Sequence, residues 1–402
     1  MKLSVFQGGF TRELAERVAN ANLEMLSTLI MKSLVHLIGE GRYDLHEAVR
    51  QYGLIQLKLA NMAEQTRAAH LETFMHLAET IEPELTHGEQ YRWLAYLETE
   101  LDNFRAALRW AFDSGNTASI LRLTGALWRF WHMRSYFVEG SQWLEKTLQM
   151  TEVGINPALR AKVLNGAGLL AYYQNHFDQA KSRLEECLAL QSHLNERDIA
   201  YAEMTLAYVV HDQFDFNCAS LLYMKALERF RRLDDSYGII RTLNGQGALA
   251  FDIGDLDTAA SLFRECLALA RECKDRENMA LAITNLGWTA AIRGDETAIG
   301  LCQEAMMLFH EQGNKLGVAF CLEGIGAGFT LASQPERAVH LFGAASAIRK
   351  MIAALPGGTH GRHVESILQR VRSTLPKETF APCWAEGEAM SLEQAIELAL
   401  TI

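Results

Sequence analysis

The segment LNGQGALAFDIGDLDTAASLFREC, residues 243–266, contains the pattern that decides the fold of this chain. Gly247 is followed by a stretch rich in Asp and Gly, and then by Ala259, Phe263 and Cys266. These last three residues share one face of a helix with 3.6 residues per turn. Asp and Gly interrupt helices. The segment therefore predicts two antiparallel helices that meet through small residues.

The same pattern occurs five times between residues 159 and 350. The alanines of the second helices are 39, 40, 39 and 40 residues apart, and a small residue precedes each by 12 positions, or by 11 in the fourth unit. A hairpin that buries its face only against the next hairpin builds a solenoid. The alanines are Ala180, Ala219, Ala259, Ala298 and Ala338, and the small residues are Gly168, Ala207, Gly247, Gly287 and Gly326. A larger residue follows each alanine by four positions: Leu184, Tyr223, Phe263, Cys302 and Phe342.

Composition narrows the class of protein. The 402 residues are 49% hydrophobic with only six prolines, which favours a well-packed helical chain. A net charge of -11 makes a large nucleic-acid footprint unfavourable, because duplex binding depends on phosphate neutralisation. The seven cysteines are scattered and predict buried thiols in a reducing cytoplasm. No metal or cofactor is predicted, and His360 and His363, in a Gly-rich connector, are expected to be solvated.

Residues 1–60 predict a different unit. Helices over about 11–21 and 22–32, the first capped by Thr11, precede a hairpin at residues 34–45 that turns at residues 39–41, and a helix restarts at His46. Two helices and a two-stranded wing are typical of a winged helix. The balanced charge of this region shows no face for DNA.

The remaining segments complete the predicted organisation. Residues 61–158 are helical and Trp-rich, with a break at Pro83 and Gly88, and Gly140 lies 40 residues before Ala180, which predicts a degenerate sixth repeat. Residues 351–402 predict a helical cap whose last helix opens with a capping box of Ser391 and Gln394. The fold class is therefore all-α: a right-handed α-solenoid with five clear hairpins at 159–350 and one degenerate hairpin before them, behind a small winged-helix-like unit. No apolar run could cross a membrane, so the chain is expected in the cytoplasm.

The hairpins resemble the tetratricopeptide repeat, in which a Gly or Ala on the first helix and Ala, bulky and Ala positions on the second recur at these offsets. Three further stretches resemble STAND/NB-ARC-type bacterial regulators of the LuxR/MalT/AfsR sort: residues 3–11 with 42–52, residues 93–108, and residues 384–395. The resemblance implies the C-terminal part of such a regulator, without the ATPase domain and the C-terminal helix-turn-helix.

This resemblance also implies a role for His46. It matches the histidine of the family's Met-His-Asp motif, which in relatives touches the β-phosphate of ADP. The chain has no phosphate-binding loop, so His46 is expected to be a vestigial nucleotide sensor packed beneath the wing. A nucleotide-responsive role would need an ATPase domain in trans.

The tetratricopeptide resemblance further implies a concave groove lined by the first helices. Its aromatic and amide side chains suit a protein or peptide, or a small uncharged effector. A DNA-binding regulator that acts through the winged helix is the alternative, and no catalytic motif supports an enzyme. The predicted groove residues are Lys162, Asn165, Tyr172, Tyr201, Tyr208, His211, Arg241, Asn244, Phe251 and Trp288.

Overall fold

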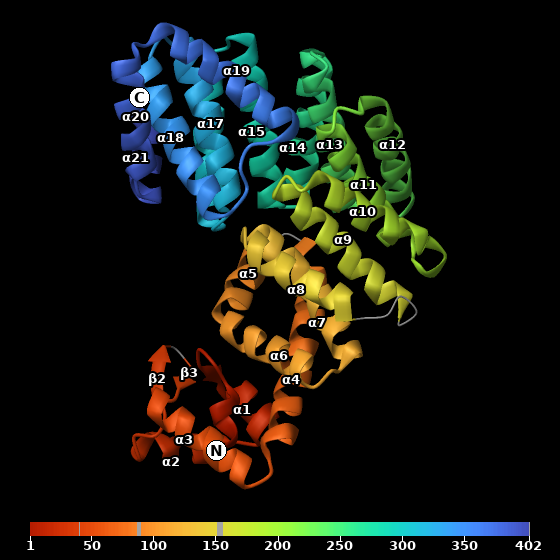
Figure 1. Ribbon diagram of the computed structural model, residues 1–402, viewed down its shortest axis with the longest axis vertical. Helices are drawn as coiled ribbons and strands as arrows, with labels where there is room; N and C mark the ends of the chain where they lie inside the picture. The colour runs from red at the N-terminus through yellow and green to blue at the C-terminus, as the bar shows by residue number, and fades with distance from the viewer. Residues whose placement is uncertain (40, 87–89, 151–155, 402) are drawn as a thin grey trace. The chain divides into compact units, whose positions relative to one another are not determined.

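A computed structural model describes residues 1–39, 41–86, 90–150 and 156–401 (Figure 1). The chain divides into two compact units. The N-terminal unit consists chiefly of Met1–Leu85 and Gln90–Leu127, and the repeat unit chiefly of Trp128–Leu148 and Val153–Ile402. The predicted break at Gly88 and the middle of the predicted turn, at Glu40, lie outside the described residues.

The N-terminal unit contains the predicted wing. Strands β2 (His36–Gly39) and β3 (Arg42–Asp44) pair antiparallel, and β1 (Phe10–Thr11) adds a third strand on the other side of β3, which the sequence did not predict. Thr11 caps the first helix as predicted, because its hydroxyl accepts from the amide of Leu14. The helices are α1 (Arg12–Ala19), α2 (Leu23–Met31), α3 (Glu47–Leu59), α4 (Ala63–Ile81), α5 (Gln90–Thr99) and α6 (Leu101–Asp113), with short 3-10 turns η1 (Lys2–Val5) and η2 (Glu82–Thr86).

The repeat unit is an α-solenoid of tetratricopeptide-like hairpins, as predicted. Two helices, α7 (Thr117–Met133) and α8 (Phe137–Met150), come before the five clear hairpins, at the place of the degenerate repeat. The five hairpins are α9 (Pro157–Tyr173) with α10 (Phe177–Ala189), α11 (Glu196–Asp212) with α12 (Phe216–Arg232), α13 (Ser236–Asp252) with α14 (Leu256–Glu272), α15 (Arg276–Arg293) with α16 (Thr297–Glu311), and α17 (Lys315–Leu331) with α18 (Pro335–Met351). A 3-10 turn, η3 (Gln191–His193), lies between the first two.

The small residues mark the closest approach of the two helices in a hairpin. A Cβ added to Gly247 would come within 2.6 Å of Phe263, and one added to Gly326 within 2.9 Å of Phe342. The bulky residue also reaches the next hairpin: a Cβ on Gly245 would lie 2.5 Å from Tyr223. Close packing of this kind leaves no room for a larger side chain, which is why the register is visible in the sequence.

Three helices follow the last hairpin: α19 (Gly358–Thr374), α20 (Lys377–Ala389) and α21 (Leu392–Leu400). Helices α20 and α21 pack against α18, and the predicted capping box of Ser391 and Gln394 is confirmed. Helix α19 behaves differently, because it crosses in front of α15 and α17 (Figure 1) and contacts α11 as well as α17. It therefore lies on the face formed by the first helices of the hairpins, which we call the concave face.

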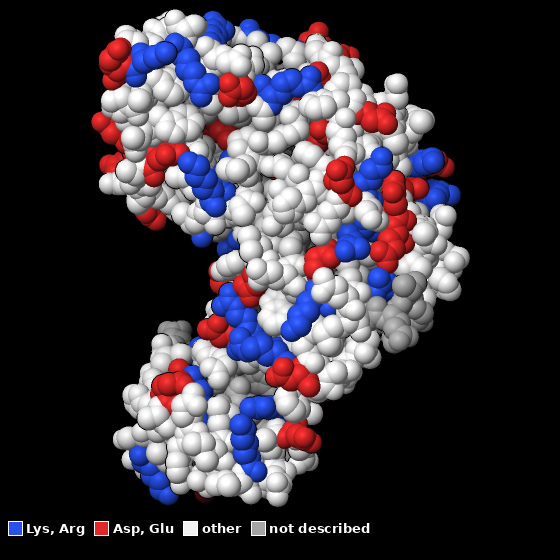
Figure 2. Space-filling model, in the orientation of Figure 1, with Lys and Arg blue, Asp and Glu red and all other residues white. Residues whose placement is uncertain are grey.

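The side of the molecule shown in Figure 2 has no strongly basic face. On the side shown in Figure 2, Lys and Arg lie next to Asp and Glu, with broad uncharged areas between them. Within the described ranges, no helix combines the length and the apolar character needed to cross a bilayer.

Candidate functional site

A cavity of about 270 Å³ lies on the concave face of the repeat unit. It is lined by side chains of the first helices and by the connector that joins α18 to α19. The lining includes His132, Tyr172, Tyr173, Asn175, Tyr208, His211, Asp212, Arg241, Asn244, Ala248, Phe251, Asp252, Glu277, Leu281, Asn285, Trp288, Phe320, Leu355, Pro356, Gly357, Thr359, His360 and His363.

The solenoid closes around this cavity. The turn between α7 and α8 meets the turn between α16 and α17: Arg134 donates to the carbonyl of Gln312, and the Leu316 amide donates to the hydroxyl of Ser135 over 3.4 Å. These residues are 178 and 181 positions apart in the chain. The turn that precedes the first clear hairpin therefore touches the turn between the fourth and fifth hairpins.

One wall of the cavity is a segment of the chain itself, residues 352–363, which we call the strap. The side chain of Asn175 donates to the carbonyl of Leu355, and the carboxylate of Asp212 accepts from both the amide (2.9 Å) and the hydroxyl (2.8 Å) of Thr359. The glycines of the strap permit this approach, because a Cβ on Gly357 would lie 2.2 Å from Asn175 and one on Gly358 2.4 Å from Asp212. The Gly-rich connector is therefore fitted to the concave face.

The two histidines of the strap are held by buried carboxylates, so the expectation that they are solvated is wrong. His363 Nε2 lies 2.6 Å from Asp252, and His360 Nε2 lies 2.7 Å from Glu323. Arg349 forms a two-pronged pair with the same Glu323, with both distances 2.7 Å. Spacing along the chain could not reveal these contacts, because His360 and Glu323 are 37 residues apart.

Two of the carboxylates that hold the strap, Glu323 and Asp252, have pKa values below their ordinary range. Burial alone would raise the pKa of Glu323, but Arg349 and His360 outweigh it and lower that pKa to about 2. Burial would likewise raise the pKa of Asp252, and hydrogen bonds from His211 and His363 bring it well below its ordinary value. The burial of His360 lowers its pKa despite the nearby Glu323.

Seven of the ten predicted groove residues line the cavity: Tyr172, Tyr208, His211, Arg241, Asn244, Phe251 and Trp288. They come from α9, α11, α13 and α15. Two of them are more buried than a groove wall would be. Trp288 is 3% exposed and its ring nitrogen donates to the carbonyl of Phe320, and Arg241 is 6% exposed.

Three predicted residues are not part of this cavity: Lys162, Asn165 and Tyr201. Tyr201 is buried, its hydroxyl donates to Asp235, and its ring lies under the guanidinium of Arg129. Asn165 is buried within α9, and Lys162 is half-buried. A role for these three residues in binding stays a prediction.

The cavity also contains carboxylates that the predicted lining omitted. Glu277 is 4% exposed, and its Oε1 lies 4.0 Å from Nη1 of Arg241, beyond hydrogen-bonding distance. Among the described residues, its Oε2 has no hydrogen-bond partner. Burial raises the pKa of Glu277 to about 7, although Arg241 opposes this shift. The part of the cavity lined by α13 and α15, which we call the floor, thus holds an incompletely paired ionisable side chain.

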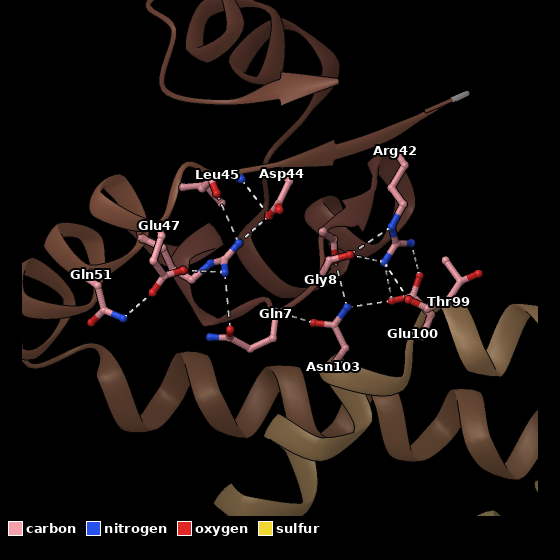
Figure 3. A network of polar contacts seen from close by, with 12 residues as sticks. Gln7, Gly8, Arg42, Asp44, Leu45, Glu47, Gln51, Thr99, Glu100 and Asn103 are labelled. Atoms are coloured by element: carbon pink, nitrogen blue, oxygen red, sulfur yellow. Dashed lines mark hydrogen bonds and ion pairs between the residues drawn. The ribbon is translucent and has the colours of Figure 1, made fainter. Parts of the chain in front are cut away.

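A second polar cluster lies in the N-terminal unit, among residues of the stretches 3–11, 42–52 and 93–108 that resemble the bacterial regulators (Figure 3). The side chain of Asn103 accepts from the amide of Gln7 (2.8 Å) and donates to the carbonyl of Gly9 (2.9 Å) and to Glu100 (2.7 Å). Arg42 binds Glu100 and donates to the carbonyl of Gly8 (2.8 Å). We call these six residues, Gln7, Gly8, Gly9, Arg42, Glu100 and Asn103, the clasp.

The contacts of the clasp join residues from three separate stretches of the sequence. Glu100 and Asn103 are fully buried, and each has charged or backbone partners. His70 closes the cluster 3.4 Å from Asn103, and burial lowers its pKa to about 4. Such a network ties the start of the chain to α6 and β3, which is a structural role.

His46 contacts the wing but is exposed rather than buried beneath it, and its role as a vestigial nucleotide sensor stays a prediction. It is the N-cap residue of α3, its side chain is exposed, and its ring stacks on His36 of β2 with the ring centres 4.4 Å apart. Elsewhere in the described parts of the chain, no three His, Cys, Asp or Glu side chains are placed to hold a metal ion.

Comparison with known proteins supports the fold. A tetratricopeptide repeat family model matches residues 198–272. The chain is 26% identical over 292 residues to a putative HTH-type transcriptional regulator of Mycobacterium bovis, and equally to those of two Mycobacterium tuberculosis strains. The match covers 68% of this chain and 33% of each relative, so the chain spans about a third of their length.

Two solved structures share the architecture. A signal transduction ATPase with numerous domains and a tetratricopeptide repeat sensor, from Pyrococcus horikoshii, aligns with 95% of this chain and 54% of its own, with a TM-score of 0.56 and 16% identity. A Rap protein complexed with competence and sporulation factor aligns over 83% of this chain and 88% of its own, with a TM-score of 0.54 and 12% identity. At these identities the likeness shows the fold of tetratricopeptide solenoids.

Proposed function

We propose that the repeat unit is a non-enzymatic recognition module that binds a polypeptide segment on its concave face. The observation that carries the proposal is the strap, because the concave face already holds one segment of polypeptide, which is irregular before Gly358 and helical from Gly358 onward. The strap is bound through donors: the amide and hydroxyl of Thr359 to Asp212, His363 to Asp252 and His360 to Glu323. A partner segment that replaces the strap must supply donors or cations at the same carboxylates.

The comparisons favour a regulatory setting for such a module. The matched mycobacterial proteins are named as putative transcriptional regulators, and the archaeal structure pairs a tetratricopeptide sensor with a signal-transduction ATPase. The Rap structure contains a bound factor. We therefore assign the chain the sensing part of a regulator of this kind, in which an occupied concave face reports the presence of a partner.

Direct DNA binding through the N-terminal unit is the less favoured reading. The chain carries a net charge of -11, and phosphate neutralisation dominates affinity for DNA.

A peptide titration tests the proposal. A fluorescent peptide with the sequence of residues 353–365, AALPGGTHGRHVE, is added to a Gly357→Leu variant, whose own strap cannot approach Asn175. We expect saturable binding by anisotropy, and at least tenfold weaker binding when Asp212→Asn and Asp252→Asn are added. Asp257→Asn, at an exposed carboxylate on α14 outside the cavity, is the matched control. Equal binding of a scrambled peptide, or no effect of the two aspartate changes, would refute the proposal.

A further inference from the structure

The side chains of the cavity floor change from charged to apolar along α13 and α15, and this order is separate from the contacts of the strap. Arg241, Asn244 and Ala248 follow one another along one face of α13, and Glu277, Leu281 and Asn285 along one face of α15. Both helices thus present a charged side chain in their N-terminal half and an amide near their middle, with Leu281 between the two on α15 and apolar side chains beyond the amide on both helices. A molecule that spans this floor meets a charged end and an apolar end.

The charged end is built for two opposite charges side by side. Among the described residues, Arg241 donates a long hydrogen bond of 3.4 Å from Nη2 to the hydroxyl of Tyr173, its guanidinium lies 5.9 Å from the ring centre of Tyr208, and its Nη1 lies 4.0 Å from Glu277. In the part of the chain that the structure describes, Oε2 of Glu277 has no partner. Buried charges in folded proteins are normally hydrogen-bonded, so both groups have unused capacity toward the cavity.

The middle of the floor carries two amide side chains that bond to each other and can still bind a polar group of a ligand. The side chain of Asn285 donates to that of Asn244 over 2.8 Å, which leaves the amide nitrogen of Asn244 and the carbonyl oxygen of Asn285 available to the cavity. Beyond this pair, Phe251 and Trp288 form apolar walls. Selectivity for a ligand with an apolar side chain follows from these walls.

We infer that the floor of the cavity binds a free α-amino acid with an aromatic or large aliphatic side chain. The carboxylate of the ligand pairs with the guanidinium of Arg241, and its ammonium with the carboxylate of Glu277. Because both charges of an α-amino acid are attached to one carbon atom, the groups that bind them must be neighbours, as Arg241 and Glu277 are. The side chain extends along α13 and α15 toward Phe251 and Trp288.

The size and enclosure of the cavity agree with this class of ligand. A volume of about 270 Å³ lies just below the ~300–1,000 Å³ typical of sites for drug-sized molecules, which favours a smaller compound. The strap forms the opposite wall, through Leu355, Thr359 and His363. The ligand therefore binds with the strap in place, and this inference does not rest on the displacement of the strap by a partner.

Calorimetric titration of the unmodified chain tests the inference. The probes are L-phenylalanine, L-tyrosine and L-leucine, with two analogues of phenylalanine: 3-phenylpropionate, which lacks the ammonium group, and 2-phenylethylamine, which lacks the carboxylate. We expect at least one of the three amino acids to bind, and both analogues to bind at least tenfold more weakly than L-phenylalanine. No heat with any amino acid, or equal affinity for an analogue, overturns the inference.

Two conservative variants locate the site. Arg241→Lys and Glu277→Gln should each weaken binding at least tenfold, whereas Glu203→Gln, a buried carboxylate on α11 that pairs with Arg229 outside this cavity, should leave it unchanged. A melting curve for each variant establishes that it is folded, and the analogues test the inference on the native chain if a variant is not. Binding that all three variants retain places the ligand elsewhere and overturns the assignment. Amino-acid binding without peptide binding would contradict only the proposed function, and the reverse only this inference.

Discussion

The clasp of the N-terminal unit and the cavity of the repeat unit contain the same kinds of side chain in opposite conditions. In the clasp, Asn103 has three partners within 2.9 Å, and Glu100 binds both Arg42 and Asn103. In the floor of the cavity, Arg241 and Glu277 are 4.0 Å apart. A satisfied buried network holds a fold together, whereas an incompletely paired one in a cavity leaves binding capacity for another molecule.

Breaking the clasp should have the largest effect on stability. Glu100→Leu leaves the guanidinium of Arg42 without its carboxylate, and removal of one partner from a buried ion pair costs about 3–5 kcal/mol. We expect urea denaturation to give a free energy of unfolding for the N-terminal unit that is lower by this amount. Asp102→Asn, which removes an exposed i,i+3 pair with Arg105, should cost no more than ~1 kcal/mol. Similar costs for the two variants would mean that the clasp is not a cooperative network.

Replacing Glu277 in the cavity floor by Gln should change the free energy of unfolding by an intermediate amount that depends on pH. Burial raises the pKa of Glu277 from its ordinary value of 4.5 to about 7; Arg241 opposes this shift, Asp275 adds to it, and Arg129 opposes it further. Between these values the unfolded chain has lost the proton that the folded chain keeps. The stability due to this group therefore falls as the pH rises through that window, by up to about 1.4 kcal/mol per unit.

The test is the difference between the native chain and Glu277→Gln. The variant cannot ionise at this position, so its free energy of unfolding should decline less between pH 4.5 and pH 7. Chemical denaturation at the two pH values measures this. Parallel pH profiles for the two proteins would show that the carboxylate of Glu277 is ionised and well paired in the folded state, which would remove the contrast with the clasp.

Loosening the strap should have the smallest global effect. Gly358 has a φ of 55°, and a methyl group there would also meet Asp212, so Gly358→Ala costs about 1–2 kcal/mol locally. We expect faster hydrogen exchange in residues 357–364 with little change in the melting temperature of the solenoid. Gly300→Ala, on α16 with open space around it, is the control. A cooperative loss of the whole repeat unit would mean that the strap is an integral part of the solenoid core.

The sequence predicted the parts of this structure that repeat. Gly247 and Phe263 recur as a pair in register because each hairpin must pack in the same way, and seven groove positions followed from that register. The strap could not be predicted in this way. Its partners Asp212, Asp252 and Glu323 lie far along the chain from the strap. Because the strap follows the last repeat, the repeat register does not show which repeat residues lie close to it in space.

The clasp gave a partial signal. Its residues stood out as parts of stretches that resemble a family of regulators, but nothing in the sequence showed which of them contact one another. The structure shows that Gln7 and Asn103 contact each other across 96 positions. Sequence patterns alone do not separate a residue that binds another part of the same chain from one that binds a ligand. The only available hint for the strap was the Leu355-Pro356-Gly357-Gly358 stretch, whose glycines permit close backbone approach.

Amide hydrogen exchange tests the central claim most directly, namely that the concave face holds the strap as a bound segment through its carboxylates. The measurement compares residues 357–364 in the native chain and in the Asp212→Asn, Asp252→Asn double variant, with Gln7 and Gly9 of the clasp as the internal reference. The account predicts at least tenfold faster exchange of the strap in the variant and unchanged exchange in the clasp. Equal protection of the strap in both proteins would contradict it.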